Sequence, residues 1–209
     1  MTKRLLLGLL LVLAGGGALA FYLLGGQPAP EPQVAVPDVQ IDTANGQTED
    51  LENMLYLDLK DGRVVIKLRP DLAPNHVARI KELVREGFYD GIVFHRVIDG
   101  FMAQTGDPTG TGAGGSGQKL KAEFSQEPHV RGTVSMARAQ SPDSADSQFF
   151  ICFDDARFLD GQYTVWGEVV EGMEFVDGIK KGSQADNGSV TGPDAIVKVQ
   201  VAADAEPAS

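Results

Sequence analysis

The alternation of apolar and polar positions predicts a β-hairpin at the start of the folded part of the chain. Two apolar runs, MLYLDL at 54–59 and RVVIKL at 63–68, flank a short Lys-Asp-Gly turn. A turn that contains glycine between two such runs is typical of antiparallel strands joined by a tight connection. We therefore expect paired strands over 54–68 and place the start of the folded domain near Asn53.

A helical pattern follows the hairpin. Pro74 opens a segment that ends at Gly87, and proline at the first helical position with glycine just past the last is the usual arrangement. Its apolar residues recur at intervals of three or four: Val77, Ile80, Leu83 and Val84. A shorter helix is expected at 173–180, where three apolar residues share one face: Met173, Val176 and Ile179.

The remaining apolar runs are short and are separated by loops that contain glycine or proline, which is typical of strands. They lie at 92–97, 101–104, 132–137, 148–153, 164–170 and 195–201. Many short strands with two helices favour a mainly β fold, a closed antiparallel barrel capped by helices. The periodicity alone does not separate a barrel from a sandwich.

The N-terminus has the pattern of an export signal. Lys3 and Arg4 precede residues 5–24, which carry no charge, and residues 18–20 (ALA) form a small-x-small cleavage site. An apolar run of about 20 residues can also span a bilayer, so residues 1–24 are a signal peptide or a membrane anchor, and we favour the anchor. Both interpretations keep the basic flank in the cytoplasm and predict a protein in the periplasm or on the outer face of the inner membrane.

The boundaries of the folded domain follow from composition. Residues 25–52 contain four prolines between positions 28 and 37 and too few apolar residues to fold alone, so we expect a Pro-rich linker. The folded domain is expected at 53–201, and residues 202–209 are expected to form a flexible tail.

Charge and residue types exclude several functions. The formal net charge of −11 disfavours nucleic-acid binding, because phosphate contacts need clustered lysines and arginines. Cys152 is the one cysteine, which excludes an intramolecular disulfide, and its apolar neighbours predict a buried thiol. His76, His95 and His129 lack the spacing of metal ligands, so no metal is expected.

The glycines at 110–115 fit the G-x-G-x-x-G pattern of a dinucleotide site. Such a site needs a helix directly after the glycines, and the residues that follow have no clear helical periodicity. A P-loop is excluded as well, because Gln118 stands after Gly117 where lysine is required. We interpret this stretch as a flexible loop and expect no cofactor.

Three segments carry a resemblance to a known family. They are FHRVIDGFMAQTGD at 94–107, GTVSMARA at 132–139 leading into SQFFI at 147–151, and FLDGQYTVWG at 158–167. In this order and spacing the chain from Met54 to Val201 resembles the cyclophilins. The resemblance implies a closed eight-stranded antiparallel barrel with two helices at its ends, and peptidyl-prolyl cis-trans isomerase activity without a cofactor.

The implied reaction breaks no covalent bond. An X–Pro amide isomerises over a barrier of about 18–20 kcal/mol that is set by resonance, and a catalyst must favour the twisted amide over both planar forms. A fixed N–H donor aimed at the prolyl nitrogen does this, because the twisted nitrogen regains its lone pair. Arg96 is our candidate donor, and it matches the family's catalytic arginine by resemblance; the alternative for a lone arginine is a surface ion pair.

The resemblance also implies a proline pocket and a peptide groove. The residues expected to contact substrate are Phe101, Met102, Gln104, Ala137, Arg138, Ala139, Gln148, Phe150, Phe158, Leu159 and Tyr163. Without the resemblance, core packing would be the favoured interpretation of the apolar members. Three of them depart from common eukaryotic members, namely Phe158 for tryptophan, Tyr163 for histidine and Arg138 for asparagine, which leaves sensitivity to cyclosporin open.

Two functions of different classes remain at this point. The favoured one is an isomerase that acts on proline-containing, unfolded or partly folded exported proteins, as a monomer and without nucleic acid. The alternative is a chaperone or assembly module that binds proline peptides with little turnover, and a purely structural envelope protein is a weaker third. The arginine together with an apolar pocket favours the enzyme.

Overall fold

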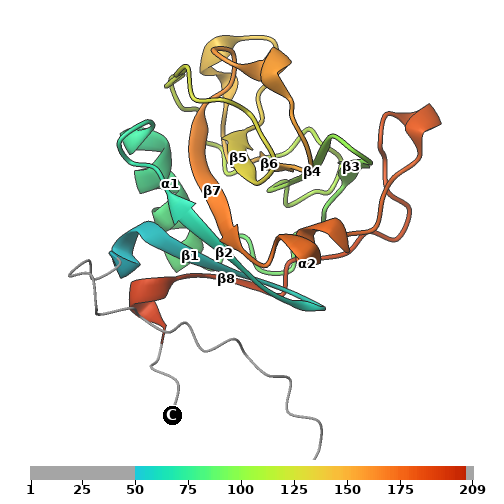
Figure 1. Cartoon of the computed structure of the whole chain (residues 1–209), viewed down its shortest axis with the longest axis horizontal. Helices are drawn as coiled ribbons and strands as arrows, with labels where there is room; N and C mark the ends of the chain where they lie inside the picture. Colours follow the sequence, from blue (N-terminus) through green and yellow to red (C-terminus); the bar gives the residue numbers. More distant parts are fainter. Residues whose placement is uncertain (1–49, 206–209) are drawn as a thin grey trace, which may run out of the picture. The chain divides into compact units, whose positions relative to one another are not determined.

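The computed structural model describes residues 50–205, in which one curled sheet is accompanied by two α-helices (Figure 1). The strands are β1 Met54–Leu59, β2 Gly62–Leu68, β3 Arg96–Ile98, β4 Met102–Thr105, β5 Thr133–Met136, β6 Phe149–Cys152, β7 Val165–Glu171 and β8 Lys198–Val201. The helices are α1 Pro74–Arg85 and α2 Met173–Asp177. The leader and most of the linker expected from the sequence lie outside the described residues. Within 50–205, no helix is long and apolar enough to cross a bilayer.

All neighbouring strands in the sheet are antiparallel. Their order is β3-β4-β6-β5-β7-β2-β1-β8. The hairpin expected over 54–68 is confirmed, because β1 pairs with β2 along its whole length, from Met54 opposite Lys67 to Leu59 opposite Gly62. Antiparallel strands can be joined by such short connections, which is why this element is visible in the sequence.

The expectation of a closed barrel is not supported. Within the described residues no ladder joins the two end strands, β3 and β8, so the eight strands form an open half-barrel. One isolated bridge between Val93 and Ala195 lies between the sheet ends, with Gly91 N–H donating to Ile196 O at 2.9 Å. Irregular segments therefore approach each other where a closed barrel would have a continuous ladder.

The strand expected at 92–97 is reduced to β3 at Arg96–Ile98. The backbone turns at this point, because His95 N–H donates to Val93 O at 3.1 Å and closes a three-residue turn. Two further bonds, from Phe94 N–H to Asp194 O and from Ile196 N–H to Ile92 O, tie the segment to a distant part of the chain. The apolar side chains of residues 92–97 predicted one extended strand. Backbone hydrogen bonds to residues about 100 positions away give the first part of this segment a different path.

Helix α1 forms where its periodicity predicted it. Pro74 is at its N-terminus, and Gly87 follows its end with φ of 69°, a left-handed conformation that glycine adopts without a steric penalty. The predicted apolar face is buried: Val77, Ile80, Leu83 and Val84. The second helix, α2, is shorter than the expected 173–180.

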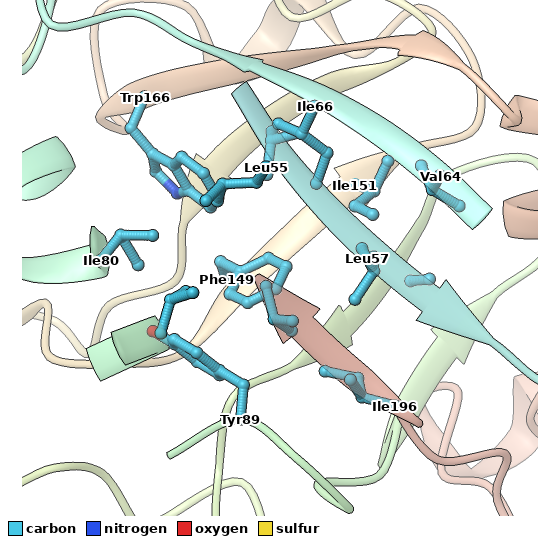
Figure 2. Packing of buried hydrophobic residues seen from close by; sticks show 14 of the residues in the cluster. Leu55, Leu57, Val64, Ile66, Ile80, Tyr89, Phe149, Ile151, Trp166 and Ile196 are labelled. Carbon is cyan, nitrogen blue, oxygen red and sulfur yellow. The ribbon is translucent and has the colours of Figure 1, made fainter. Parts of the chain in front are cut away.

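Large side chains from several strands meet inside the sheet (Figure 2). Phe149 on β6 is at the centre, with its ring edge-on to Tyr89 at 5.6 Å and to Trp166 at 5.3 Å between centroids. Cys152 is fully buried in a second apolar cluster, as expected, and burial raises the pKa of its thiol to about 12. This thiol is therefore a core group and not a reactive one.

The structure differs from the sequence interpretation just after β8, where a flexible tail was expected. Residues Ala202–Asp204 form a 3₁₀ turn, and Ala202 is buried. Arg85 Nε on α1 donates to the Asp204 carboxylate at 2.8 Å, and Gln200 donates to Asp204 O at 2.7 Å. These contacts hold residues that looked like a frayed end in the sequence.

Candidate active site

The sheet edge brings the predicted Arg96 and Gln104 together. They are directly opposite each other in the β3–β4 pairing, and Arg96 Nη1 donates to Gln104 Oε1 at 3.1 Å. The same nitrogen lies 3.9 Å from Met102 Sδ. Arg96 is half-buried, and burial lowers the pKa of its guanidinium. Because arginine titrates far above neutral pH, the group stays charged at the edge of an apolar surface.

A directional chain of amides holds Gln104 in place. Its Nε2 donates to Gln148 Oε1 at 2.9 Å, and Gln148 Nε2 donates in turn to the carbonyl oxygens of Gly112 at 3.0 Å and Gly114 at 2.8 Å. Since the amide nitrogen of Gln104 is occupied in this way, its oxygen must face Arg96. The two predicted glutamines therefore act together, and they link the arginine to the glycine-rich loop.

That loop is organised by one buried carboxylate. Asp107 accepts backbone N–H bonds from Thr109 at 2.7 Å, Gly112 at 2.6 Å and Gly114 at 3.1 Å. Burial alone would raise the pKa of Asp107, but these hydrogen bonds outweigh it and hold the pKa well below its ordinary value. The residues directly after the glycines, 116–122, form no helix, so the dinucleotide interpretation is not supported. The loop lies beside the site, held by Asp107.

The predicted apolar residues gather beside the arginine. Met102, Phe150 and Leu159 are buried in one cluster, and Phe101 and Tyr163 are packed against it. This cluster, which we call the apolar pocket surface, is defined by Phe101, Met102, Phe150, Leu159 and Tyr163. Within it the Phe150 and Tyr163 rings meet edge-on, with centroids 5.8 Å apart. The structure thus separates these residues from the main core around Phe149.

Phe158 and the 137–139 segment border the apolar pocket surface. Phe158 is 67% exposed, and its ring lies 5.4 Å from that of Phe101. The Ala137 N–H is occupied, because it donates to Gln148 O at 2.9 Å, whereas Ala139 is exposed. A bound peptide could therefore pair only with the other backbone groups of 137–139.

Arg138 is braced within the protein. Its Nε donates to Gln162 O at 3.0 Å and its Nη1 to Ala139 O at 3.0 Å. The guanidinium lies 4.8 Å from the Tyr163 ring centroid, a cation–π distance. The side chain that replaces the family's common asparagine thus packs against the ring that replaces its common histidine.

Sequence reasoning missed two residues of the site. Asn187 accepts hydrogen bonds from Arg96 with two of its atoms. His129 is fully buried beneath Phe150, with its ring nearly parallel at 6.2 Å, and it contacts Asp160 through Nδ1 at 3.0 Å. The Asn-Gly pair at 187–188 is a turn signal, but no pattern connects it with Arg96, and His129 was considered only as a metal ligand. Among residues 50–205 no group of side chains is arranged to hold a metal ion.

Stability should fall as the solution is acidified below neutral pH. Burial lowers the pKa of His129, which faces Asp160 and Ser135, and of His95, which faces Asp107 and Arg96. The unfolded chain then takes up these protons first, near the ordinary histidine value of 6.5, so acid favours the unfolded state. The lowered pKa of Asp107 adds a second loss below about 3.8, its ordinary value.

Urea unfolding at pH 7.5, 5.5 and 3.5 measures this dependence. We expect the unfolding midpoint to fall from each pH to the next lower one. In His129→Asn the fall from pH 7.5 to 5.5 should be smaller, because this variant removes one of the two imidazoles whose pKa is lowered by burial. A midpoint that rises from pH 7.5 to 5.5 would contradict the expectation. The contribution of His129 would be refuted by an unchanged fall over this range in the variant.

The folded part of the chain is similar to known peptidyl-prolyl isomerases. A family model described as "Cyclophilin type peptidyl-prolyl cis-trans isomerase/CLD" matches residues 54–201. A "Probable peptidyl-prolyl cis-trans isomerase" of Brucella suis is 60% identical over 167 residues, which cover 74% of this chain and 85% of the relative. A "Peptidyl-prolyl cis-trans isomerase" of Helicobacter pylori is 43% identical over 148 residues, covering 68% and 90%.

Solved structures agree with these sequence matches. A cyclophilin from Hirschia baltica superimposes with a TM-score of 0.67 at 31% identity, covering 76% of this chain and 77% of that one. A cyclophilin-type isomerase of Cryptosporidium parvum, solved in the presence of the dipeptide Ala-Pro, gives a TM-score of 0.65 at 27% identity, covering 71% and 98%.

Proposed function

This chain belongs to the cyclophilin-type peptidyl-prolyl cis-trans isomerase family, and from that premise we propose how its own residues isomerise X–Pro bonds. Arg96 is the catalytic residue, and the apolar pocket surface receives the proline ring. One observation carries this assignment: a charged guanidinium lies at the edge of that surface, with Nη1 3.9 Å from Met102 Sδ.

The chemistry follows from the amide itself. Twisting the X–Pro bond removes its resonance, and the prolyl nitrogen becomes pyramidal with a localised lone pair. An N–H of Arg96 donates to that lone pair, which exists only in the twisted state, so the interaction lowers the barrier instead of merely binding substrate. Gln104 and Gln148 keep the guanidinium from turning away, and no electron pair leaves the substrate.

The apolar pocket surface has a second role in this mechanism. Phe101, Met102, Phe150 and Leu159 hold the proline ring while the chain on the other side of the amide rotates. Excluding water from the ring also strengthens the hydrogen bond from Arg96, because charge interactions grow as the local dielectric constant falls. The exposure of Ala139 supports pairing with an extended peptide, as in strand addition.

We propose proline-containing, unfolded or partly folded polypeptides as the substrates. A relative solved in the presence of Ala-Pro supports this choice of substrate class. The full-length protein should accelerate the cis-to-trans relaxation of a short Ala-Pro-Phe-type peptide. If it bound the peptide without accelerating its relaxation, the protein would instead be the binding module weighed in the sequence analysis.

The proposed place of action is the periplasm or the outer face of the inner membrane. Support comes from the basic pair Lys3-Arg4 before an uncharged apolar run. Protease added outside spheroplasts should digest the folded domain, and survival of that domain would overturn the proposal. The intact mass of the protein recovered from membranes separates the two kinds of leader, because loss of residues 1–20 excludes an anchor.

A further inference from the structure

The guanidinium of Arg96 is held from two sides. It has five N–H groups in a rigid plane. Asn187 takes two of them: its backbone O accepts from Nε at 3.0 Å, and its side-chain Oδ1 accepts from Nη2 at 3.0 Å. Gln104 Oε1 takes a third, from Nη1. Within residues 50–205 no oxygen acceptor is paired with the last two, one on each terminal nitrogen.

The loop that carries Asn187 is fixed directly to the strand that carries Arg96. Val97, the next residue of β3, donates to Gly188 O at 2.8 Å and accepts from Gly182 N–H at 2.9 Å. Within the loop, Gly188 N–H donates to Ser183 O at 2.8 Å. In Figure 1 the orange segment that follows α2 rises beside the β3 edge. These hydrogen bonds therefore fix the backbone next to Asn187, the residue that contacts Arg96.

The backbone conformation of Asn187 is unusual. Its φ of 52° makes it the one non-glycine residue with positive φ among residues 50–205. Asparagine tolerates this left-handed region better than most residues, and glycine tolerates it best. A purely structural turn would be served equally well by glycine, which would keep the backbone bond to Nε. Only an asparagine or aspartate also offers an oxygen to Nη2.

We propose that Asn187 is a positioning residue for the catalytic arginine. Together with Gln104 it holds three of the five donors, so that the remaining N–H of Nη2 has no acceptor within residues 50–205 and the second N–H of Nη1 has only the weak acceptor Met102 Sδ. These two N–H groups are the ones that can turn to the prolyl nitrogen of the substrate. Without Oδ1 the guanidinium can rotate about the Cδ–Nε bond. The N–H that donates to the prolyl nitrogen then points at that nitrogen for a smaller part of the time. This inference rests on the proposed role of Arg96 in the isomerase reaction.

Asn187→Gly in the full-length protein isolates the side chain, because it keeps both the left-handed backbone and the carbonyl that accepts from Nε. NMR line-shape analysis of an Ala-Pro-Phe-type peptide separates the dissociation constant from the cis–trans exchange rate of the bound peptide. We expect the bound-state rate to fall about 3- to 10-fold, the net size of an ordinary hydrogen bond, because Asn187 is exposed to solvent. The dissociation constant should change less than twofold.

Two controls exclude a general effect of glycine in this loop. Gln184→Gly lies in the same loop, is exposed and makes no hydrogen bond to Arg96, so it should leave both quantities unchanged. Asn187→Asp keeps an oxygen at the same position and should retain more of the bound-state rate than Asn187→Gly. An unchanged bound-state rate in Asn187→Gly, or an equal fall in Gln184→Gly, overturns the inference.

A double-mutant cycle separates this inference from the function on which it rests. In an Arg96→Ala background, Asn187→Gly should lower the residual rate no further, because the group that it positions is gone. A further fall in that background would show that Asn187 acts in another way. If Arg96→Ala kept the wild-type rate, the proposed catalytic role of Arg96 would fail. If Arg96→Ala lowered the rate but Asn187→Gly did not, only the positioning role of Asn187 would be refuted.

Discussion

Arg96→Ala should lower kcat/KM for a proline peptide by about 100- to 1000-fold, which is typical for removal of a donor that acts on the transition state. The side chain supplies the only charged donor that we assign to the prolyl nitrogen, and alanine leaves nothing to stabilise its lone pair. Peptide binding should weaken much less, since the apolar pocket surface stays intact. Peptide relaxation at several enzyme concentrations measures the loss.

Two further variants test whether the loss is specific to the guanidinium of Arg96. Arg96→Lys keeps a positive charge but loses the planar fork that Gln104 and Asn187 hold, so it should recover only a small part of the activity. Arg85→Ala is the matched control, because Arg85 is a half-exposed arginine on α1 that pairs with Glu52 and Asp204. It should keep full activity. If Arg96→Ala retained a third or more of the wild-type rate, catalysis would have to be assigned elsewhere.

Phe149→Ala should lower the free energy of unfolding by about 3–5 kcal/mol, the usual loss for a buried phenylalanine. The side chain is 3% exposed and fills the centre of the core between Tyr89 and Trp166 (Figure 2). Alanine leaves a cavity and removes both edge-on ring contacts. Because domains are stable by about 5–15 kcal/mol in total, this one change removes a large share, and urea unfolding measures it.

Phe158→Ala is the matched control for this prediction. It makes the same chemical change at a side chain that is 67% exposed, so the free energy of unfolding should move by no more than about 0.5 kcal/mol. Equal losses in the two variants would contradict the packing argument. Phe149 also precedes Phe150 on β6, so a Phe149→Ala protein that remains folded should bind a proline peptide more weakly through displacement of its neighbour.

Elements with local causes were predictable. The β1–β2 hairpin and α1 depend on a glycine turn, a proline, a terminal glycine and apolar spacing, all within one short window. The strand expected at 92–97 was too long, because the conformation of this segment depends on residues far away in the chain. Its first half bonds to residues 194–196, about 100 positions away, and no local pattern reports that pairing.

The residues of the candidate site also fall into two groups, those that the sequence predicted and those that only the structure revealed. Arg96 and Gln104 lie on adjacent strands of one short hairpin, where register sets them opposite each other, and the resemblance named both. Asn187 is 91 residues from Arg96 in the chain, and His129, in a loop, lies beneath the ring of Phe150 on β6. Side chains so far apart meet only when the sheet curls, so their roles could not be predicted.

The amino-acid sequence by itself determined the local elements, the mainly β class and, through three long motifs, the family and most of the expected site. The tertiary structure decided that the sheet ends as an open half-barrel, that Asp204 pairs with Arg85 of α1, and that hydrogen bonds hold Arg96 from two sides. The physical reason is common to all three. Local structure depends on steric and periodic rules within a few residues, whereas these features depend on hydrogen bonds between segments that only the complete fold brings together.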